Sequence, residues 1–263
     1  MGDSVPKDLE VKKKEFMQEF YTEKFLKDID KIKRNFNAEY KSMPKSAKEK
    51  SKENFAIKFT YNTQRIEGST LTLKETANLL ENGITPSSRP LRDVKEAEAH
   101  EKVFYEMLAY DKDLTLDIVL KWHKELFEGT KKDIAGKIRD HEVGIARSKF
   151  KPPKHQILKL LLKEFFDWYN ENRKKIHPVE LASLVHLKFV TIHPFSDGNG
   201  RISRLMMNFV LKKFDFPLLD IPYNKRNSYY NALEKSQVNK EENTFVQWLF
   251  RKYLEEYKGN LKK

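Results

Sequence analysis

Apolar residues recur at helical spacing along almost the whole chain, and this periodicity restricts the fold more than any other feature of the sequence. Between residues 11 and 40 the candidate buried positions are Phe16, Phe20, Phe25, Ile29 and Ile32. Apolar residues three or four positions apart share one face of an α-helix, which buries that face against its neighbours. We therefore expect an all-α bundle.

Glycine, proline and asparagine interrupt this pattern and set the expected ends of the helices. The expected helical ranges are 11–40, 46–66, 71–80, 91–110, 114–127, 156–172, 178–192, 201–214, 228–235 and 244–257. The longest interruption, at residues 129–153, contains Gly136, Gly144 and Pro152-Pro153 around the alternating Val143 and Ile145. Alternation bounded by such residues predicts a short β-hairpin.

Composition excludes several classes of protein. The chain has no cysteine, which rules out disulfides and thiolate metal sites. No apolar run reaches the roughly 18 residues that a membrane helix needs. The N-terminus lacks the apolar core of a secretory signal. We expect a cytoplasmic protein without a membrane segment.

The formal net charge of +12 allows two interpretations. Lysine-rich helices commonly carry such a charge as a solvated surface, whereas a basic face can also bind nucleic acid. The lysines are spread along the chain and mixed with glutamates, as between Pro44 and Glu53. This favours a solvated surface and leaves a basic nucleic-acid-binding regulator as the alternative from a different functional class.

The run HPFSDGNGRISR, residues 193–204, lies between two strongly apolar helical patterns. Gly198, Asn199 and Gly200 can adopt positive φ at low cost, and successive N–H groups in such a turn form an anion-binding nest. The N-terminus of the following helix adds a favourable dipole. The run therefore predicts a loop that binds a polyphosphate.

Charged side chains in the same run fit this interpretation. Arg201 and Arg204 are three residues apart, so they lie on one side of the new helix and can reach over the same anion. Asp197 precedes the nest, where a carboxylate beside phosphates is best explained as a Mg²⁺ ligand. His193 ends the preceding helix and is suited to take a proton from an attacking hydroxyl. Each feature alone also occurs in ordinary turns between helices, whereas the combination favours a functional site.

The run resembles the signature of the Fic family of nucleotidyltransferases, HxFx(D/E)GNGRxxR, and matches every defined position. The resemblance covers roughly residues 25–257 and implies the Fic fold, a helical bundle with a small β-hairpin flap. It also implies a protein adenylyltransferase, which transfers AMP from ATP to a Ser, Thr or Tyr hydroxyl of a target protein or of itself and releases pyrophosphate.

The resemblance implies a role for each residue of the site. His193 is the general base, Asp197 holds Mg²⁺ (or Mn²⁺), and Arg204 contacts the γ-phosphate. The remaining nucleotide contacts are Gly198, Asn199, Gly200, Arg201, Tyr229, Tyr230 and Gln237, the last at a position where the family often has asparagine. The flap, which binds the target by β-strand addition, supplies Val143, Ile145, Ala146, Arg147 and Ser148, with Ala146 where the family often has glycine.

A second motif lies far upstream. Thr63-Gln64-Arg65-Ile66-Glu67-Gly68 resembles the inhibitory motif of the family, (S/T)xxxE(G/N). Thr63 and Glu67 share one helix face because they are four residues apart. The resemblance implies a member with an N-terminal inhibitory helix, in which Glu67 pairs with Arg204 and removes the γ-phosphate ligand. In some members the same glutamate positions a water that removes AMP from a modified target, so de-AMPylation is the alternative within the enzyme class.

These motifs predict three parts of the chain. Residues 1–90 form an N-terminal helical region with the inhibitory motif, residues 91–240 form the Fic core with flap and loop, and residues 241–263 form a C-terminal helix that packs on the core. The first twenty or so residues have no clear counterpart in the family. The resemblance also implies a homo-oligomer, most simply a dimer.

Overall fold

The structure, a computed structural model, describes the backbone of residues 7–262 and the side chains of residues 23–262. Phe16 and Phe20, which we expect to be buried, lie outside the described side chains. The described residues are mostly helical and contain no strand. The all-α prediction is therefore confirmed.

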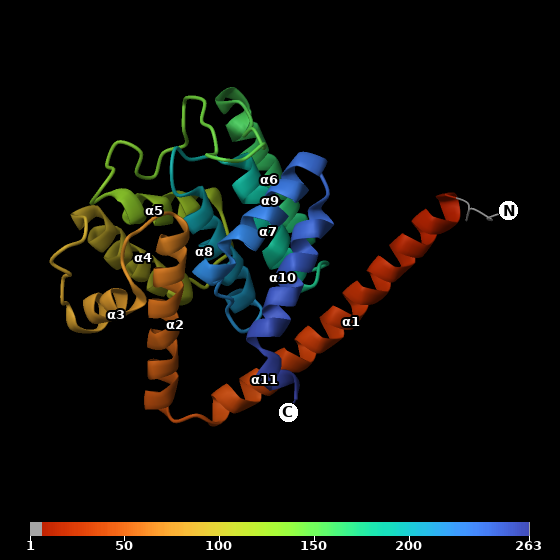
Figure 1. The fold of residues 1–263 in the computed structure, drawn as a ribbon, viewed down its shortest axis with the longest axis horizontal. Coiled ribbons are helices and arrows are strands. Elements are labelled where there is room, and N and C mark those ends of the chain that lie inside the picture. The colour runs from red at the N-terminus through yellow and green to blue at the C-terminus, as the bar shows by residue number, and fades with distance from the viewer. Residues whose placement is uncertain (1–6, 263) are drawn as a thin grey trace.

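The helices follow the expected order along the chain, with ends shifted by a few residues (Figure 1). They are α1 (Lys7–Ser42), α2 (Lys45–Ile66), α3 (Leu73–Asn82), α4 (Leu91–Ala109), α5 (Leu116–Phe127), α6 (Leu158–Asn172), α7 (Pro178–Ile192), α8 (Asn199–Lys213), α9 (Arg226–Asn239), α10 (Glu242–Glu256) and α11 (Lys258–Leu261), with 3-10 turns η1 (His155–Ile157) and η2 (Tyr223–Lys225).

Local sequence explains where several helices begin. At α3, Thr72 Oγ1 accepts a hydrogen bond from the Glu75 N–H at 3.2 Å, and the Glu75 carboxylate accepts one from the Thr72 N–H at 2.8 Å. This reciprocal capping box satisfies N–H groups that the first turn leaves free. At α7, Pro178 occupies the first position, where its missing N–H costs no helical hydrogen bond.

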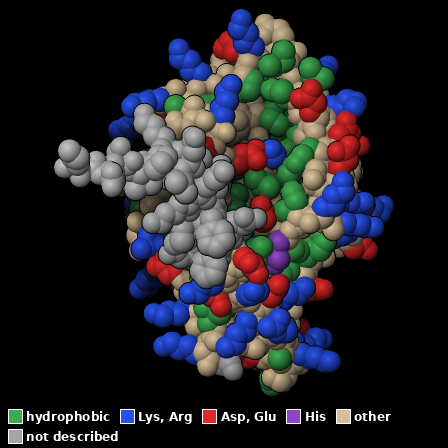
Figure 2. Space-filling model, turned by 90° about the vertical axis from the view of Figure 1, so that its right-hand side faces the viewer, with side chains coloured by type: hydrophobic (Ala, Val, Ile, Leu, Met, Phe, Trp, Pro, Cys, Tyr) green, Lys and Arg blue, Asp and Glu red, His purple; other side chains and the backbone are tan. Residues whose placement is uncertain are grey.

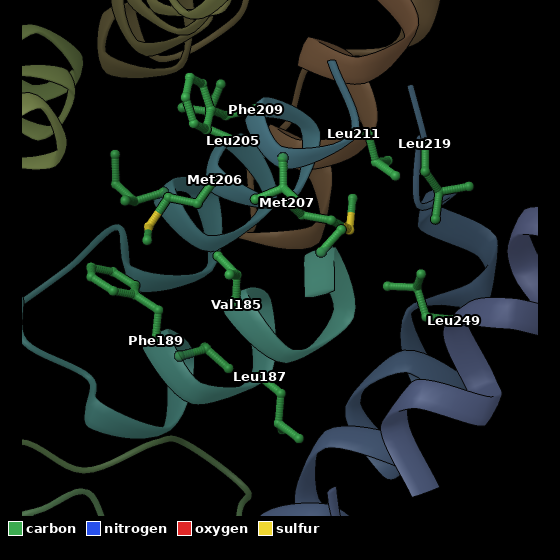
Figure 3. Close-up of a cluster of buried hydrophobic side chains, with 14 of the residues drawn as sticks. Val185, Leu187, Phe189, Leu205, Met206, Met207, Phe209, Leu211, Leu219 and Leu249 are labelled. Carbon is green, nitrogen blue, oxygen red and sulfur yellow. The ribbon is translucent and has the colours of Figure 1, made fainter. Parts of the chain in front are cut away.

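α7 and α8 lie at the centre of the bundle and pack against each other. Figure 3 shows Val185 and Phe189 of α7 in one cluster of buried side chains with Met206 and Met207 of α8. Burial of a side chain of this size is worth about 1.5–3 kcal/mol. The two helices therefore hold both ends of the loop that joins them.

α2 brings the upstream motif to this centre, since it packs against α4 and also contacts α8. Its last turns are fixed by buried hydrogen bonds. Thr60 Oγ1 lies 2.9 Å from His100 Nδ1 of α4, and Asn62 Nδ2 donates to Asp220 Oδ2 at 2.6 Å. These contacts fix the position of the residues that follow them, including Glu67.

α1 is the longest helix and lies at the edge of the bundle (Figure 1). Ile29 and Ile32 are fully buried where it packs near α10 and α11, while its N-terminal end extends beyond the other helices. α10 in turn packs on α7 and α9. The division of the chain into three parts stays a prediction.

The predicted β-hairpin at residues 129–153 is wrong. This segment forms turns and irregular loops that pass over one end of the bundle (Figure 1). Its backbone groups bond elsewhere than across a strand pair, for example where the Ser148 N–H donates to the Ile145 carbonyl at 3.1 Å and closes a turn. Pro152 and Pro153 have no N–H to give to a ladder. The apolar alternation of Val143 and Ile145 reflects half-burial on the bundle, which does not require a partner strand.

Basic side chains are dispersed over the face drawn in Figure 2 and interspersed with acidic ones. This arrangement is typical of a solvated charged surface, and no single basic patch covers that face. Within the described residues, no helix is long and apolar enough to cross a membrane.

Candidate active site

The loop between α7 and α8 is held in shape by its own side chains. α7 ends at Ile192. His193 follows as its C-cap with a left-handed backbone at φ 52°, and Pro194 prevents the helix from continuing. The Asn199 side chain accepts a hydrogen bond from the Phe195 N–H at 2.9 Å and donates one to the Phe195 carbonyl at 2.8 Å. Asn199 therefore closes the loop from inside.

Gly198 is the only residue of the Gly-Asn-Gly turn with positive φ, at 86°, because α8 already begins at Asn199. A Cβ at Gly198 would lie 2.5 Å from Cε2 of Phe127, so both conformation and packing require glycine here. The first turn of α8 leaves N–H groups without helical partners, which favours an anion at this end of the helix.

Asp197 and Arg201 belong to one network of charged side chains. Arg201 Nη2 donates to Asp197 Oδ1 at 2.9 Å, and Arg201 Nη1 pairs with Glu96 of α4. Lys131 donates to Asp197 Oδ2, and its Nζ lies 3.7 Å from Glu96 Oε1. Burial raises the pKa of Asp197, but Arg201 and Lys131 outweigh this effect and hold that pKa at about 2. Asp197 is therefore a carboxylate at neutral pH.

Arg204 points away from this network and toward the upstream motif. Its buried guanidinium donates from Nε to Thr63 Oγ1 at 3.2 Å and from Nη1 to Tyr229 Oη at 3.2 Å. Nη2 donates to Glu67 Oε1 at 2.6 Å. The contact between Glu67 and Arg204 that the family resemblance implies is present. Arg201 and Arg204, although three residues apart, bind different partners.

Glu67 follows the last residue of α2, and Gly68 after it has φ 98°. The carboxylate of Glu67 lies so close to Gly200 that a Cβ there would be 2.4 Å from Oε1. Gly200 therefore provides the space that this carboxylate fills.

His193 is mostly shielded from solvent, and this burial lowers its pKa below the ordinary value. Its Nδ1 lies 3.2 Å from the Val190 carbonyl, which can only accept a hydrogen bond. Nδ1 therefore carries the proton, and Nε2 is left with a lone pair. A neutral imidazole in this tautomer is a proton acceptor.

A cleft of about 710 Å³ joins both motifs to the flap segment and to α9. His193, Glu67, Gly68 and Gly200 line it, and so do most of the predicted nucleotide and target contacts outside the loop: Tyr229, Tyr230, Gln237, Ile145, Ala146, Arg147 and Ser148. The predicted residues that do not line it are Thr63, Val143, Asp197, Gly198, Asn199, Arg201 and Arg204. The volume is within the range of small-molecule sites, which is roughly 300–1,000 Å³.

The α9 side of the cleft is held by hydrogen bonds to the neighbouring helices. Tyr230 Oη donates at 3.2 Å to the carbonyl of Ile66, the residue directly before Glu67. Gln237 Nε2 donates to Thr191 Oγ1 at 3.1 Å. Tyr230 is thus bonded to the end of α2, which carries the upstream motif, and Gln237 is bonded to the last turn of α7, which precedes the loop.

Sequence reasoning missed several residues that position the loop. Arg139 is buried, and its guanidinium donates to the carbonyls of His193 at 2.9 Å, His141 at 2.8 Å and Pro153 at 2.6 Å. The Arg139 N–H also donates to the Pro194 carbonyl at 2.9 Å. One side chain therefore joins the flap segment to the end of α7.

His123 supports the loop from the other side. It accepts a hydrogen bond at Nδ1 from the Gly136 N–H at 2.9 Å, so its Nε2–H donates to the Asp197 carbonyl at 3.0 Å. Its ring stacks on Phe195 with centroids 3.8 Å apart. Burial lowers the pKa of His123 to about 4, which keeps this ring neutral.

Gln64 connects the upstream motif to the charged network. Gln64 Nε2 donates to the Glu96 carbonyl at 2.7 Å, and Gln64 Oε1 accepts from Arg201 Nη1 at 3.3 Å. Its position directly after Thr63 was the only signal in the sequence that pointed to it.

Comparison with known proteins identifies related chains. The Fic/DOC family matches residues 113–211, from the start of α5 through most of α8. The protein adenylyltransferase fic-1 of Caenorhabditis elegans is 31% identical over 186 residues, which are 68% of this chain and 36% of that protein. The protein adenylyltransferase Fic of Drosophila yakuba is 31% identical over 216 residues, or 81% and 43%. The chain thus spans less than half the length of these curated relatives.

Solved structures share the fold over most of the chain. A Fic domain-containing signaling protein from Bacteroides thetaiotaomicron has a TM-score of 0.79 at 26% identity, covering 89% of this chain and 96% of that one. Fic-1 of C. elegans has a TM-score of 0.78 at 25% identity, covering 93% and 72%. By the match over residues 113–211, the related sequences and the shared fold, the chain belongs to the Fic/DOC family.

Proposed function

We propose that this chain transfers AMP from ATP to a Ser, Thr or Tyr hydroxyl of a protein, and that Glu67 restrains the transfer. The observation that carries this proposal is one cleft that His193 and Glu67 both line, with the Glu67 carboxylate bonded to Arg204. The curated relatives named protein adenylyltransferase support the type of reaction.

His193 acts as the general base. Its Nε2 accepts the proton of the target hydroxyl while the hydroxyl oxygen attacks the α-phosphorus of ATP. The bond between the α-phosphorus and its bridging oxygen to the β-phosphate breaks, and pyrophosphate leaves with the bonding electrons. The lowered pKa of His193 keeps the imidazole neutral and ready to accept that proton.

The phosphate chain is held by the loop and the first turn of α8. Gly200 leaves space beside the helix N-terminus, and Arg204 supplies a fixed positive charge for the terminal phosphate. Transfer of this kind depends chiefly on positioning and on neutralising phosphate charge.

The carboxylate of Asp197 is the ligand that would bind a metal ion. The described residues contain no group of three or more metal-binding side chains. Mg²⁺ commonly binds through one or two carboxylates together with substrate phosphates, and an ionised Asp197 fits that type of site. When bound there, Mg²⁺ (or Mn²⁺) would neutralise phosphate charge.

Glu67 restrains transfer by competition. The Glu67 carboxylate accepts a hydrogen bond from Nη2 of Arg204, and the γ-phosphate of ATP is an anion that would bind the same group. With Glu67 in place, ATP binds without its γ-phosphate ligand and therefore in an unproductive position.

Incubation with labelled ATP and Mg²⁺ tests this proposal. Glu67→Gly protein should label itself or an added target much more strongly than the parent, and His193→Ala in the same background should abolish the label. Mass spectrometry of the product should show an added AMP. Folded Glu67→Gly protein that binds ATP but transfers no AMP to any protein would refute the proposal.

De-AMPylation is a second candidate, because Glu67 lies in the same cleft as His193. A carboxylate at this point can orient a water toward AMP on a modified target. Release of AMP by the parent chain and its loss in Glu67→Gly would establish this activity.

Self-modification and dimerisation belong to the same proposal and have separate measurements. Intact mass after incubation with ATP reports AMP on the chain itself. Light scattering at several protein concentrations reports a dimer.

A further inference from the structure

The flap segment carries three exposed basic side chains next to residues that line the cleft. Arg147, Lys149 and Lys151 are exposed, whereas Ser148 and Phe150 between them are half-buried. None of the three basic side chains has an ion pair or hydrogen bond with another described residue. We call these three residues the basic rim.

The basic rim meets the cleft at Arg147, its first residue. Arg147 lines the cleft together with Ile145 and Ser148, and His193 lines the same cleft. Arg226 of α9 also lines the cleft, and its Nη1 donates to the Tyr223 hydroxyl rather than to a carboxylate. Two arginines, Arg147 and Arg226, therefore line the cleft.

Three carboxylates close to the basic rim in sequence, or in contact with its backbone, are bonded to other groups. Asp140 pairs with His141 at 3.0 Å, and Glu142 pairs with His155 at 2.8 Å. Glu234 of α9 accepts a hydrogen bond from the backbone N–H of Lys149 at 3.3 Å, so it binds the main chain of the rim and leaves the ammonium groups unpaired. The positive charge of the rim is thus directed to solvent.

The rim is also held in place. Arg139 ties the start of the segment to the end of α7, and the Lys149–Glu234 contact ties its middle to α9. Arg147 has a positive φ of 63°, a conformation that a non-glycine residue adopts rarely and often near a functional site. A charged surface that is positioned before a partner arrives binds that partner at a lower cost in entropy.

We propose that the basic rim binds an acidic segment of the target protein, so that the hydroxyl residue presented to His193 is flanked by Asp or Glu. This inference rests on the proposed AMP transfer and adds the chemical class of its protein substrate. Complementary charge at the edge of an interface chiefly steers encounter and selects among partners. We therefore expect acidic flanks to improve binding of the target, with little effect on binding of ATP.

A charge-reversal experiment tests the inference in Glu67→Gly protein. Two peptides of equal length carry one central Thr, flanked by Glu in one and by Lys in the other. Binding is followed by fluorescence anisotropy and AMP transfer by mass spectrometry. The Glu-flanked peptide should bind about tenfold more tightly, equivalent to about 1.4 kcal/mol, and the preference should shrink as ionic strength rises from about 0.05 to 0.3 M.

Lys149→Glu combined with Lys151→Glu should reverse the preference, so that the Lys-flanked peptide binds better. Lys52→Glu combined with Lys74→Glu makes the same change in net charge at exposed positions on α2 and α3, and it should leave the preference intact. Equal binding of both peptides, or a preference that the rim reversal leaves unchanged, overturns the inference. Failure of the proposed function looks different, since the Glu67→Gly protein would then transfer no AMP to any protein, itself included.

Discussion

Gly200→Ala provides a direct test of how the site is packed. A Cβ at this position would lie 2.4 Å from Glu67 Oε1 and 3.1 Å from Arg204 Nη1, whereas ordinary contact begins near 3.4 Å. The backbone of Gly200 is helical, so alanine is allowed there. The Glu67 carboxylate is the end of a flexible side chain, and it must withdraw. Its 2.6 Å hydrogen bond to Arg204 is then lost.

The expected change in stability follows from two opposing terms. A hydrogen bond to a charged group contributes about 1.5–3 kcal/mol. Alanine in place of a helical glycine returns about 0.5–1 kcal/mol. Gly200→Ala should therefore lower the free energy of unfolding by about 0.5–2.5 kcal/mol, which corresponds to a fall in Tm of roughly 1–10 °C for a chain of this size.

Urea unfolding followed by circular dichroism measures this change, and a second background identifies its cause. In Glu67→Gly protein the carboxylate is gone, so Gly200→Ala should be neutral or stabilising. Gly259→Ala is the matched control, because a Cβ at that helical glycine meets nothing within 4 Å. Equal destabilisation of both backgrounds by Gly200→Ala would refute a collision with the Glu67 carboxylate.

Four further predictions concern residues around the site. Burial raises the pKa of the Asp220 carboxyl from 3.8 to about 7, so the folded state holds this proton more tightly than the unfolded state does. The free energy of unfolding should therefore fall as pH rises from about 4 to 7. Asp220→Asn should remove that fall, as measured by urea titrations at several pH values. The pKa of Asp197 is instead held at about 2. Its contribution to the free energy of unfolding is therefore complete above pH 3.8 and is lost as pH falls toward 2. Asp197→Asn should remove the pH dependence of the free energy of unfolding over that range. Lys131→Met removes the hydrogen bond from Lys131 to Asp197 and should tighten binding of Mn²⁺ about tenfold, as measured by electron paramagnetic resonance. Lys132→Met, at an exposed position, should not change this binding. Arg139→Ala should speed hydrogen exchange across residues 140–154, since it removes three side-chain hydrogen bonds; unchanged exchange there would contradict its assigned role.

Sequence reasoning gave the correct backbone structure where short runs of residues determine it. The order of the helices follows from apolar spacing, and the loop shape follows from glycine and proline within residues 193–204. The contact of Glu67 with Arg204 was accessible only through family resemblance, because 137 positions separate the two residues.

The remaining parts depend on contacts that have no local pattern. Lys131 bonds to Asp197 and Lys132 is exposed, yet nothing in a chain with 51 lysines and arginines distinguishes these neighbours. Arg139 likewise acts through carbonyls brought together by the fold. The hairpin prediction failed because alternation reports which residues are half-buried, whereas a strand also needs a partner for its backbone.

The anchoring of α2 determines what kind of switch this site can contain. Thr60, Asn62, Thr63 and Gln64 are all buried and bonded to other parts of the bundle, whereas Glu67 lies beyond the last helical residue. Detaching α2 would expose buried core residues to water, and its free-energy cost would be that of a local unfolding event. Rotation of the Glu67 side chain breaks one bond worth about 1.5–3 kcal/mol. Relief of the proposed restraint is therefore a change of rotamer, which a weak ligand can drive without opening the fold.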